Sequence, residues 1–158
     1  MKQTGIDMAT YGAEVHWERK GESFADNRYS RAHTWRFDGG QTVPASASPH
    51  IVPFPMSDPA AVDPEEAFVA SLASCHMLFF LSFAARDGWT VESYTDDARG
   101  TMENGPEGMW MSRVELRPLV RFEGTQPSSR EIDDLHHRSH AACFLARSVR
   151  SEIRLTPR

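Results

Sequence analysis

The sequence predicts an α+β fold in which a sheet packs against helices. Two stretches, residues 63–88 and 128–149, show helical apolar periodicity behind clear N-terminal signals. Between and around them lie shorter runs with the alternation of strands, and strand runs adjacent in sequence favour antiparallel pairing. The predicted element order is β-β-α-β-β-α-β, with no internal repeat.

The first two predicted strands cover residues 11–18 and 29–37. In the first, one side carries Tyr11, Ala13, Val15 and Trp17, which predicts a strand with one buried face. In the second, Arg31 shares a side with aromatic residues and is expected to point inward. Because an unpaired inward charge is costly, Arg31 should have a carboxylate or another anion as its partner.

Residues 41–62 form a connector with five prolines, at positions 44, 49, 53, 55 and 59. Neither side of it shows a second complete core, so we expect an ordered segment of one domain. Long irregular segments inside a compact domain are often functional.

The helix that follows is the centre of the predicted fold. Asp63 suits the N-cap, Pro64 the first helical position, and Glu65 with Glu66 places negative charge at the positive end of the helix dipole. Residues 86–88, Arg-Asp-Gly, supply a stop signal. The helix is apolar nearly all round, which predicts that it is mostly buried in the domain or against a partner chain.

After this helix, residues 89–102 and 110–122 read as two strands, and Pro118 marks a bulge or an edge. Ser128 and Glu131 form a capping box that opens the second helix. Its apolar stripe comprises Ile132, Leu135, Ser139, Ala142, Ala146 and Val149, and Cys143 lies one position off it. Residues 152–156 can form a last short strand.

Length and composition limit the class of protein. A chain of 158 residues is most simply one domain, residues 1–158. A net charge of -5 disfavours nucleic acid or an anionic membrane as a partner, and the longest apolar run, residues 77–85, is too short to span a bilayer. Residues 1–5 lack the apolar region of a signal peptide, so the expected location is the cytoplasm.

The two cysteines, Cys75 and Cys143, leave several readings open. Either alone is most simply a small core residue. Two helices that share one core can bring both thiols within disulfide reach, about 5.5–6 Å between Cα atoms. A metal site is the rival reading, with His136, His140 and Cys143 spaced to face one way and His76 as a fourth ligand. Acyl hydrolysis is weaker, because no glycine-rich elbow surrounds Cys75.

Three short motifs carry a resemblance to a known family. Ser48-Pro49-His50, then Asp63-Pro64-Glu65-Glu66 followed by Ser74-Cys75, and finally His140-Ala141-Ala142-Cys143 resemble the OsmC/Ohr family over about residues 11–156. The resemblance implies antiparallel sheets packed on two long helices in an intertwined homodimer. It also implies an antioxidant peroxidase that reduces organic hydroperoxides, and in some members hydrogen peroxide, without metal, haem or another cofactor. A dithiol such as a lipoyl group would be the reductant.

Carried over residue by residue, the resemblance implies that Cys75 is the peroxidatic cysteine and Cys143 the resolving one. Glu65 matches the catalytic glutamate, and Arg31 matches the catalytic arginine, with Arg28 as the alternative. Phe144 stands where the family usually has a helix-breaking proline. This departure favours a second reading, an OsmC-fold dimer without turnover that binds or senses; a His/Cys zinc protein is the third.

The spacing of the matched residues sets a geometric condition. A reactive cysteine must be a thiolate, which a nearby guanidinium favours. Glu65 lies ten residues before Cys75, about 15 Å along a straight helix. Either the helix is therefore interrupted after Glu66, or Arg31 and Glu65 reach the thiol from the other subunit.

Overall fold

The computed structural model describes residues 8–158 and shows two compact units, one ending at Pro64 and one spanning Glu65–Arg158. Each unit is described by itself, and the single domain expected over residues 1–158 stays a prediction. Residues 1–5, where we expect no signal peptide, lie outside the described residues.

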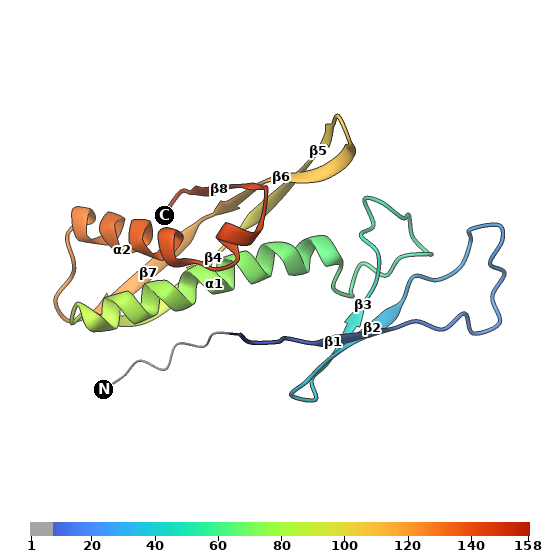
Figure 1. Cartoon of the computed structure of the whole chain (residues 1–158), viewed down its shortest axis with the longest axis horizontal. Coiled ribbons are helices and arrows are strands. Elements are labelled where there is room, and N and C mark those ends of the chain that lie inside the picture. The colour runs from blue at the N-terminus through green and yellow to red at the C-terminus, as the bar shows by residue number, and fades with distance from the viewer. Residues whose placement is uncertain (1–7) are drawn as a thin grey trace. The chain divides into compact units, whose positions relative to one another are not determined.

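The first unit contains a three-stranded antiparallel sheet, β1-β2-β3 (Figure 1). Its strands are β1 (Ala13–His16), β2 (His33–Phe37) and β3 (Thr42–Ala45). The two predicted strands are confirmed but shorter, and Arg31 lies before β2 instead of within it. β3 is an addition inside the proline-rich connector. Because β3 lies at the edge of the sheet, its Pro44 is tolerated opposite Thr34.

The prediction that one face of β1 is buried is wrong for the single chain. All four of its residues are exposed, and the side chain of Val15 is 66% exposed. The alternation of apolar residues therefore marks a face of β1 that the described chain leaves uncovered.

The proline-rich connector is ordered, as expected. Ser46 N–H donates to the carbonyl of Val62 at 3.0 Å, and the hydroxyl of Ser46 accepts from Asp58 N–H at 3.0 Å. Ser46, Ser48 and Ser57 are all buried. The hydroxyls of Ser46 and Ser48 accept from main-chain N–H groups of the connector and help to hold this segment in shape.

Helix α1 (Pro64–Arg86) opens the second unit and runs without interruption. Its predicted ends are confirmed: it begins after Asp63, and Gly88 adopts a φ of 85°, which glycine favours after a helix. Its buried residues form one stripe with a spacing of four: Leu72, His76, Phe80 and Ala84. The expectation of a mostly buried helix is wrong for the chain by itself, since the side chain of Leu78 is 61% exposed.

The two long strands predicted after α1 are four strands. They are β4 (Thr90–Asp96), β5 (Arg99–Gly105), β6 (Gly108–Leu116) and β7 (Pro118–Glu123), so Pro118 begins a strand. β4 pairs with β7, and β5, β6 and β8 (Glu152–Leu155) form a second sheet. Pairing is antiparallel except between β6 and β8, which are parallel because the chain crosses over through α2 between them.

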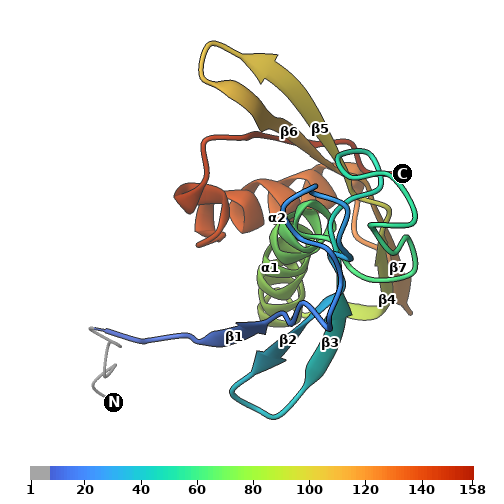
Figure 2. The ribbon, with the colours of Figure 1, turned by 90° about the vertical axis from the view of Figure 1, so that its right-hand side faces the viewer.

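Helix α2 (Ser129–Ala142) begins with the predicted capping box: Ser128 N–H donates to Glu131 Oε2 at 2.7 Å, and Glu131 N–H donates to Ser128 Oγ at 3.3 Å. The helix ends earlier than predicted, and residues 146–148 form the separate 3₁₀ turn η1 (Ala146–Ser148). In Figures 1 and 2, α1 and α2 lie side by side along one face of the strands of this unit.

The buried stripe of α1 contacts two apolar clusters. Leu72 packs with Val114 and Leu116 of β6, whereas Phe80 and Ala84 pack with Leu135 of α2. Cys75 and His76 lie on α1 between these clusters. By length and composition alone α1 would also suffice to cross a membrane, but core helices of soluble proteins meet the same criterion, and its buried apolar residues Leu72, Phe80 and Ala84 belong to these clusters.

Candidate active site

The two thiols of the chain meet in the second unit. Cys75 is half-buried in the middle of α1, whereas Cys143, directly after α2, is buried with 1% exposure. Neither is in a disulfide, and Cys75 lies near enough to Cys143 to be among the causes that raise the pKa of its thiol. Of the readings that the sequence left open, the structure therefore supports two thiols that share one core.

The environment of the two sulfurs is unequal. Burial, followed by the interaction with Cys75, raises the pKa of the Cys143 thiol above its ordinary value. Cys143 therefore stays an S–H group at neutral pH. Its own sulfur accepts from Ala146 N–H at 3.4 Å.

The end of α2 explains how Cys143 takes this place. The sequence analysis put Cys143 inside a helix, which is wrong: it is the C-cap, with φ -61° and ψ 114°. Its N–H still donates to the carbonyl of Ser139 at 2.9 Å. The guanidinium of Arg147 donates to the carbonyl of Ala141 from Nη2 at 2.7 Å and from Nε at 3.2 Å. This side chain satisfies a carbonyl that the end of a helix leaves without a partner, so α2 stops although Phe144 is no proline.

A pair of buried histidines joins α1 to α2 beside the thiols. The Nε2 atom of His76 and the Nδ1 atom of His136 are 3.0 Å apart, and the rings are stacked with centroids 5.4 Å apart. Burial is the main cause that lowers the pKa of His76 to about 3 and that of His136 to about 4. Both rings are therefore neutral at physiological pH, and one donates to the other.

This pair was missed at the sequence level, where His76 and His136 counted only as possible metal ligands. A signal was available for His76, which lies four residues after Leu72 and four before Phe80 on the buried stripe of α1. Among residues 8–158, no three His, Cys, Asp or Glu side chains are arranged to hold a metal ion, so the rival reading of a site at His136, His140 and Cys143 is not supported.

Arg31 lies in the first unit, in a loop that holds its guanidinium. The Nη2 atom donates to Asn27 Oδ1 at 2.8 Å, Nη1 donates to the carbonyl of Tyr29, and the guanidinium lies 3.7 Å from the centroid of the Tyr29 ring. The predicted aromatic neighbour is present in Tyr29, but the predicted carboxylate partner is wrong among residues 8–158, where Arg31 donates to the amide oxygen of Asn27 and to main-chain carbonyls. Arg28, the alternative, is exposed in the same loop. The approach of either arginine to Cys75 stays a prediction.

Glu65 is the second residue of α1 and is half-buried. Because α1 runs unbroken from Pro64 to Arg86, the alternative of a helix interrupted after Glu66 is wrong. Glu65 and Cys75 are therefore about 15 Å apart along one helix. Within one chain the helix separates the carboxylate from the thiol.

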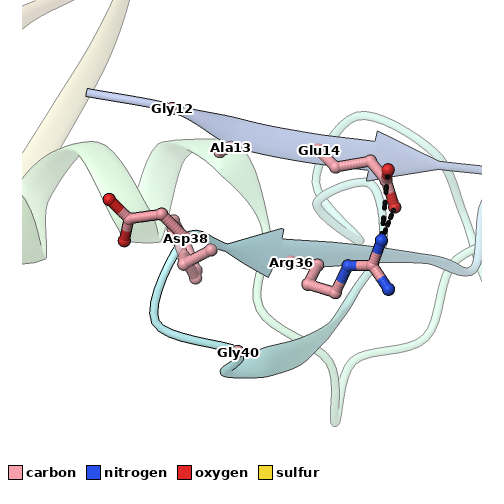
Figure 3. Close-up of a pocket in the computed structure, with 7 residues that line it drawn as sticks. Gly12, Ala13, Glu14, Arg36, Asp38 and Gly40 are labelled. Carbon is pink, nitrogen blue, oxygen red and sulfur yellow. Dashed lines mark hydrogen bonds and ion pairs between the residues drawn. The ribbon is translucent and has the colours of Figure 1, made fainter. Parts of the chain in front are cut away.

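A hollow of about 450 Å³ in the first unit lies apart from these residues in the sequence. Figure 3 shows Glu14 on β1 facing Arg36 on β2, and this ion pair measures 3.2 Å. The wall of the hollow also includes Gly12, Ala13, Phe37, Asp38 and Gly40. None of the predicted site residues lines this hollow, and its ion pair is already satisfied, so it is not the candidate active site.

Comparisons with known proteins agree with the fold. The family model described as OsmC-like protein matches residues 57–158. A solved OsmC-like protein of unknown function from Vibrio cholerae is 51% identical, covers 96% of this chain and 100% of its own, and superposes with a TM-score of 0.93.

More distant structures share the fold. An organic hydroperoxide resistance protein from Elizabethkingia anophelis is 16% identical over 95% of this chain and 94% of its own, with a TM-score of 0.70. The organic hydroperoxide resistance protein OhrB of Bacillus subtilis is 13% identical over 95% and 98%, with a TM-score of 0.63. No protein of curated function matched the chain.

Proposed function

Since the chain belongs to the OsmC-like protein family, we propose that it is a cysteine-based peroxidase that reduces organic hydroperoxides. The observation that carries the proposal is that the half-buried Cys75 and the buried Cys143 are both free thiols and interact with each other. Two thiols of unequal exposure in one core suit a cycle in which the accessible sulfur reacts first and the buried one follows. Two structurally similar proteins are named for organic hydroperoxide resistance, which supports the same substrate class.

In the first step the thiolate of Cys75 attacks the outer oxygen of the hydroperoxide. The O–O bond breaks, the sulfur becomes a sulfenic acid, and the alkoxide takes up a proton and leaves as the alcohol. The guanidinium of Arg31 would add the positive charge that a thiolate needs in an apolar setting.

In the second step the Cys143 sulfur attacks the sulfenic acid. An S–S bond forms, the S–O bond breaks, and hydroxide leaves with the thiol proton as water. An external dithiol then reduces the disulfide, and a lipoyl group is the proposed reductant. The cycle needs no metal or cofactor. The cytoplasm, which keeps such thiols reduced, is the proposed location.

We further propose that the working unit is a homodimer with composite sites. The supporting observation is the continuous α1, which keeps Glu65 about 15 Å from Cys75 of the same chain. In a dimer, Glu65 and Arg31 of one subunit would approach the thiols of the other. A stable monomer with full activity at micromolar concentration would contradict this part of the proposal.

The test is a stopped-flow titration of the reduced protein with cumene hydroperoxide and with hydrogen peroxide, followed by mass spectrometry for a 75–143 disulfide. Cys75→Ser should abolish turnover, and Cys143→Ser should react once and then stall or over-oxidise. Ser74→Ala, at the exposed neighbour of Cys75, is the control and should keep wild-type rates. Sustained turnover by Cys143→Ser would remove Cys143 from the mechanism.

The same experiment separates the second reading, a dimer that binds or senses without turnover. In that case the wild-type protein would form the disulfide once and would not be recycled by any dithiol. The departure that favoured this reading, Phe144 in place of proline, does not lengthen α2, because Arg147 caps the end of the helix instead.

A further inference from the structure

Phe144 is an exposed aromatic side chain beside the most buried sulfur of the chain. Its side chain is 68% exposed, whereas Cys143 is 1% exposed. The Phe144 ring meets the ring of Phe79 edge to face, with centroids 5.1 Å apart and planes at 81°. Phe79 lies on α1 four residues after Cys75, about one helical turn further along. The ring contact thus joins the turn that follows Cys75 to the residue that follows Cys143.

The segment that carries Phe144 has only local hydrogen bonds. The hydrogen bonds described for residues 144–148 all have their partners within residues 141–148. Ser148 Oγ donates to the carbonyl of Phe144 at 2.8 Å, and the main-chain N–H of Ser148 donates to the carbonyl of Leu145 at 2.9 Å. Cys143 itself has left the helical conformation. The N–H of Cys143 stays bonded to the carbonyls of Ser139 and His140 at the end of α2, and the ring of Phe144 adds a side-chain contact to α1 directly after it.

We propose that the contact between Phe79 and Phe144 positions Cys143 against Cys75 for disulfide formation. The inference rests on the proposed function and assigns the ring pair to its second step, in which the S–O bond of the sulfenic acid is replaced by the S–S bond and water leaves. Phe144 is a positioning residue, since it acts through Cys143. The attack of Cys75 on the peroxide does not depend on it.

The size of the effect follows from the strength of such a contact. An edge-to-face aromatic pair changes the population of the arrangement it stabilises by about two- to tenfold. The same factor should apply to the effective concentration of one thiol at the other. Cys143 is the neighbour of Phe144 in sequence, and Cys75 lies one helical turn before Phe79.

The experiment compares Phe144→Ala with three other variants. Phe144→Tyr keeps the ring, and Leu145→Ala removes a neighbouring exposed side chain outside the ring pair. Phe144→Pro removes the ring but keeps the end of α2, because the φ of -61° and ψ of 114° at Cys143 suit a residue before proline.

Two measurements are made on each reduced protein. Single-turnover stopped flow with cumene hydroperoxide should show the attack within twofold of wild type in every variant. Disulfide formation should slow about two- to tenfold in Phe144→Ala and Phe144→Pro only, with more dimedone-trapped sulfenic acid at Cys75. Equilibration in glutathione buffer should show the same fold loss in the effective concentration of the thiol pair.

The glutathione measurement needs no peroxidase activity, so it tests the positioning role separately. The proposal is overturned if Phe144→Ala matches wild type there, or if Leu145→Ala loses as much. A wild-type protein that forms the disulfide in glutathione buffer but does not react with any hydroperoxide would instead overturn the proposed function.

Discussion

The two units of the chain both expose some large apolar side chains, but they differ in how many they bury. In the second unit, Leu72, Phe80 and Leu135 are buried in clusters between helices and strands. In the first unit, Val15 and Phe54 are 66% and 75% exposed, and only Ala45 among the apolar side chains counts as core in the described residues 8–64. Extended apolar exposure is uncommon in a stable monomer, so the comparison supports the proposed dimer, in which a partner covers this surface.

The largest expected effect concerns the core of the second unit. Leu135 is fully buried beside Phe80 and Ala84, so Leu135→Ala should lower the free energy of unfolding by about 2–5 kcal/mol in urea denaturation. Val15→Ala in β1 is the matched variant and should cost less than about 0.5 kcal/mol if Val15 stays exposed.

A large loss of unfolding free energy in Val15→Ala would contradict the difference between the two units. If that loss grows with protein concentration, the exposed face of β1 is buried between two copies. A large loss that is independent of concentration would contradict the exposure of β1.

The second effect tests the role proposed for Arg31. Arg31→Ala should slow the reaction of Cys75 with cumene hydroperoxide about 10- to 100-fold at neutral pH, because an opposite charge near a thiol typically shifts its ionisation by one unit or more. Arg36→Ala, in the same unit and exposed, is the control and should react like wild type.

If Arg28→Ala shows the loss and Arg31→Ala does not, the arginine assignment moves to Arg28. Equal rates in all three variants would show that the first unit supplies no charge to the thiol.

The third effect concerns acid stability, which should arise in the second unit. His76 and His136 have folded-state pKa values of about 3 and about 4, whereas an unfolded chain binds these protons near pH 6.5. The unfolded state therefore takes up more protons as the pH falls from 6.5 towards 3. The contribution of the pair to stability is complete above about pH 6.5 and is lost over that window, with a slope of about 1.4 kcal/mol per pH unit for each proton.

Urea unfolding at a series of pH values measures this slope. His136→Phe should flatten it, and His137→Gln, one residue away on the exposed face of α2, should leave it unchanged. A wild-type slope in His136→Phe would mean that other groups cause the acid sensitivity.

The sequence predicted those elements whose signals are local. Asp63, Pro64 and Gly88 set the ends of α1, and Ser128 with Glu131 set the start of α2. The proximity of Cys75 and Cys143 was one of several readings left open by the sequence, because two predicted helices that share a core can bring both thiols together. The family match confirms the resemblance, and the site residues carried over from it stay predictions.

The errors arose where tertiary contacts decide. The apolar alternation at 114, 116, 120 and 122 continues past Arg117, where β6 ends and β7 begins, so the sequence predicts one strand there instead of two. The stop of α2 depends on Arg147 folding back onto Ala141, which no residue pattern marks. The pairing of His76 with His136 joins positions 60 residues apart, and no local spacing reveals it.

The smallest expected effect returns to the first unit. Glu14 and Arg36 pair across β1 and β2 at 3.2 Å with both side chains about 60% exposed, so water screens the charges. Glu14→Gln should change the free energy of unfolding by less than about 1 kcal/mol, and the difference should shrink further in 0.5 M salt. A loss above this range that salt does not reduce would mean that the hollow in Figure 3 is covered in the working assembly, which would extend the partner contact of the first unit from Val15 to this ion pair.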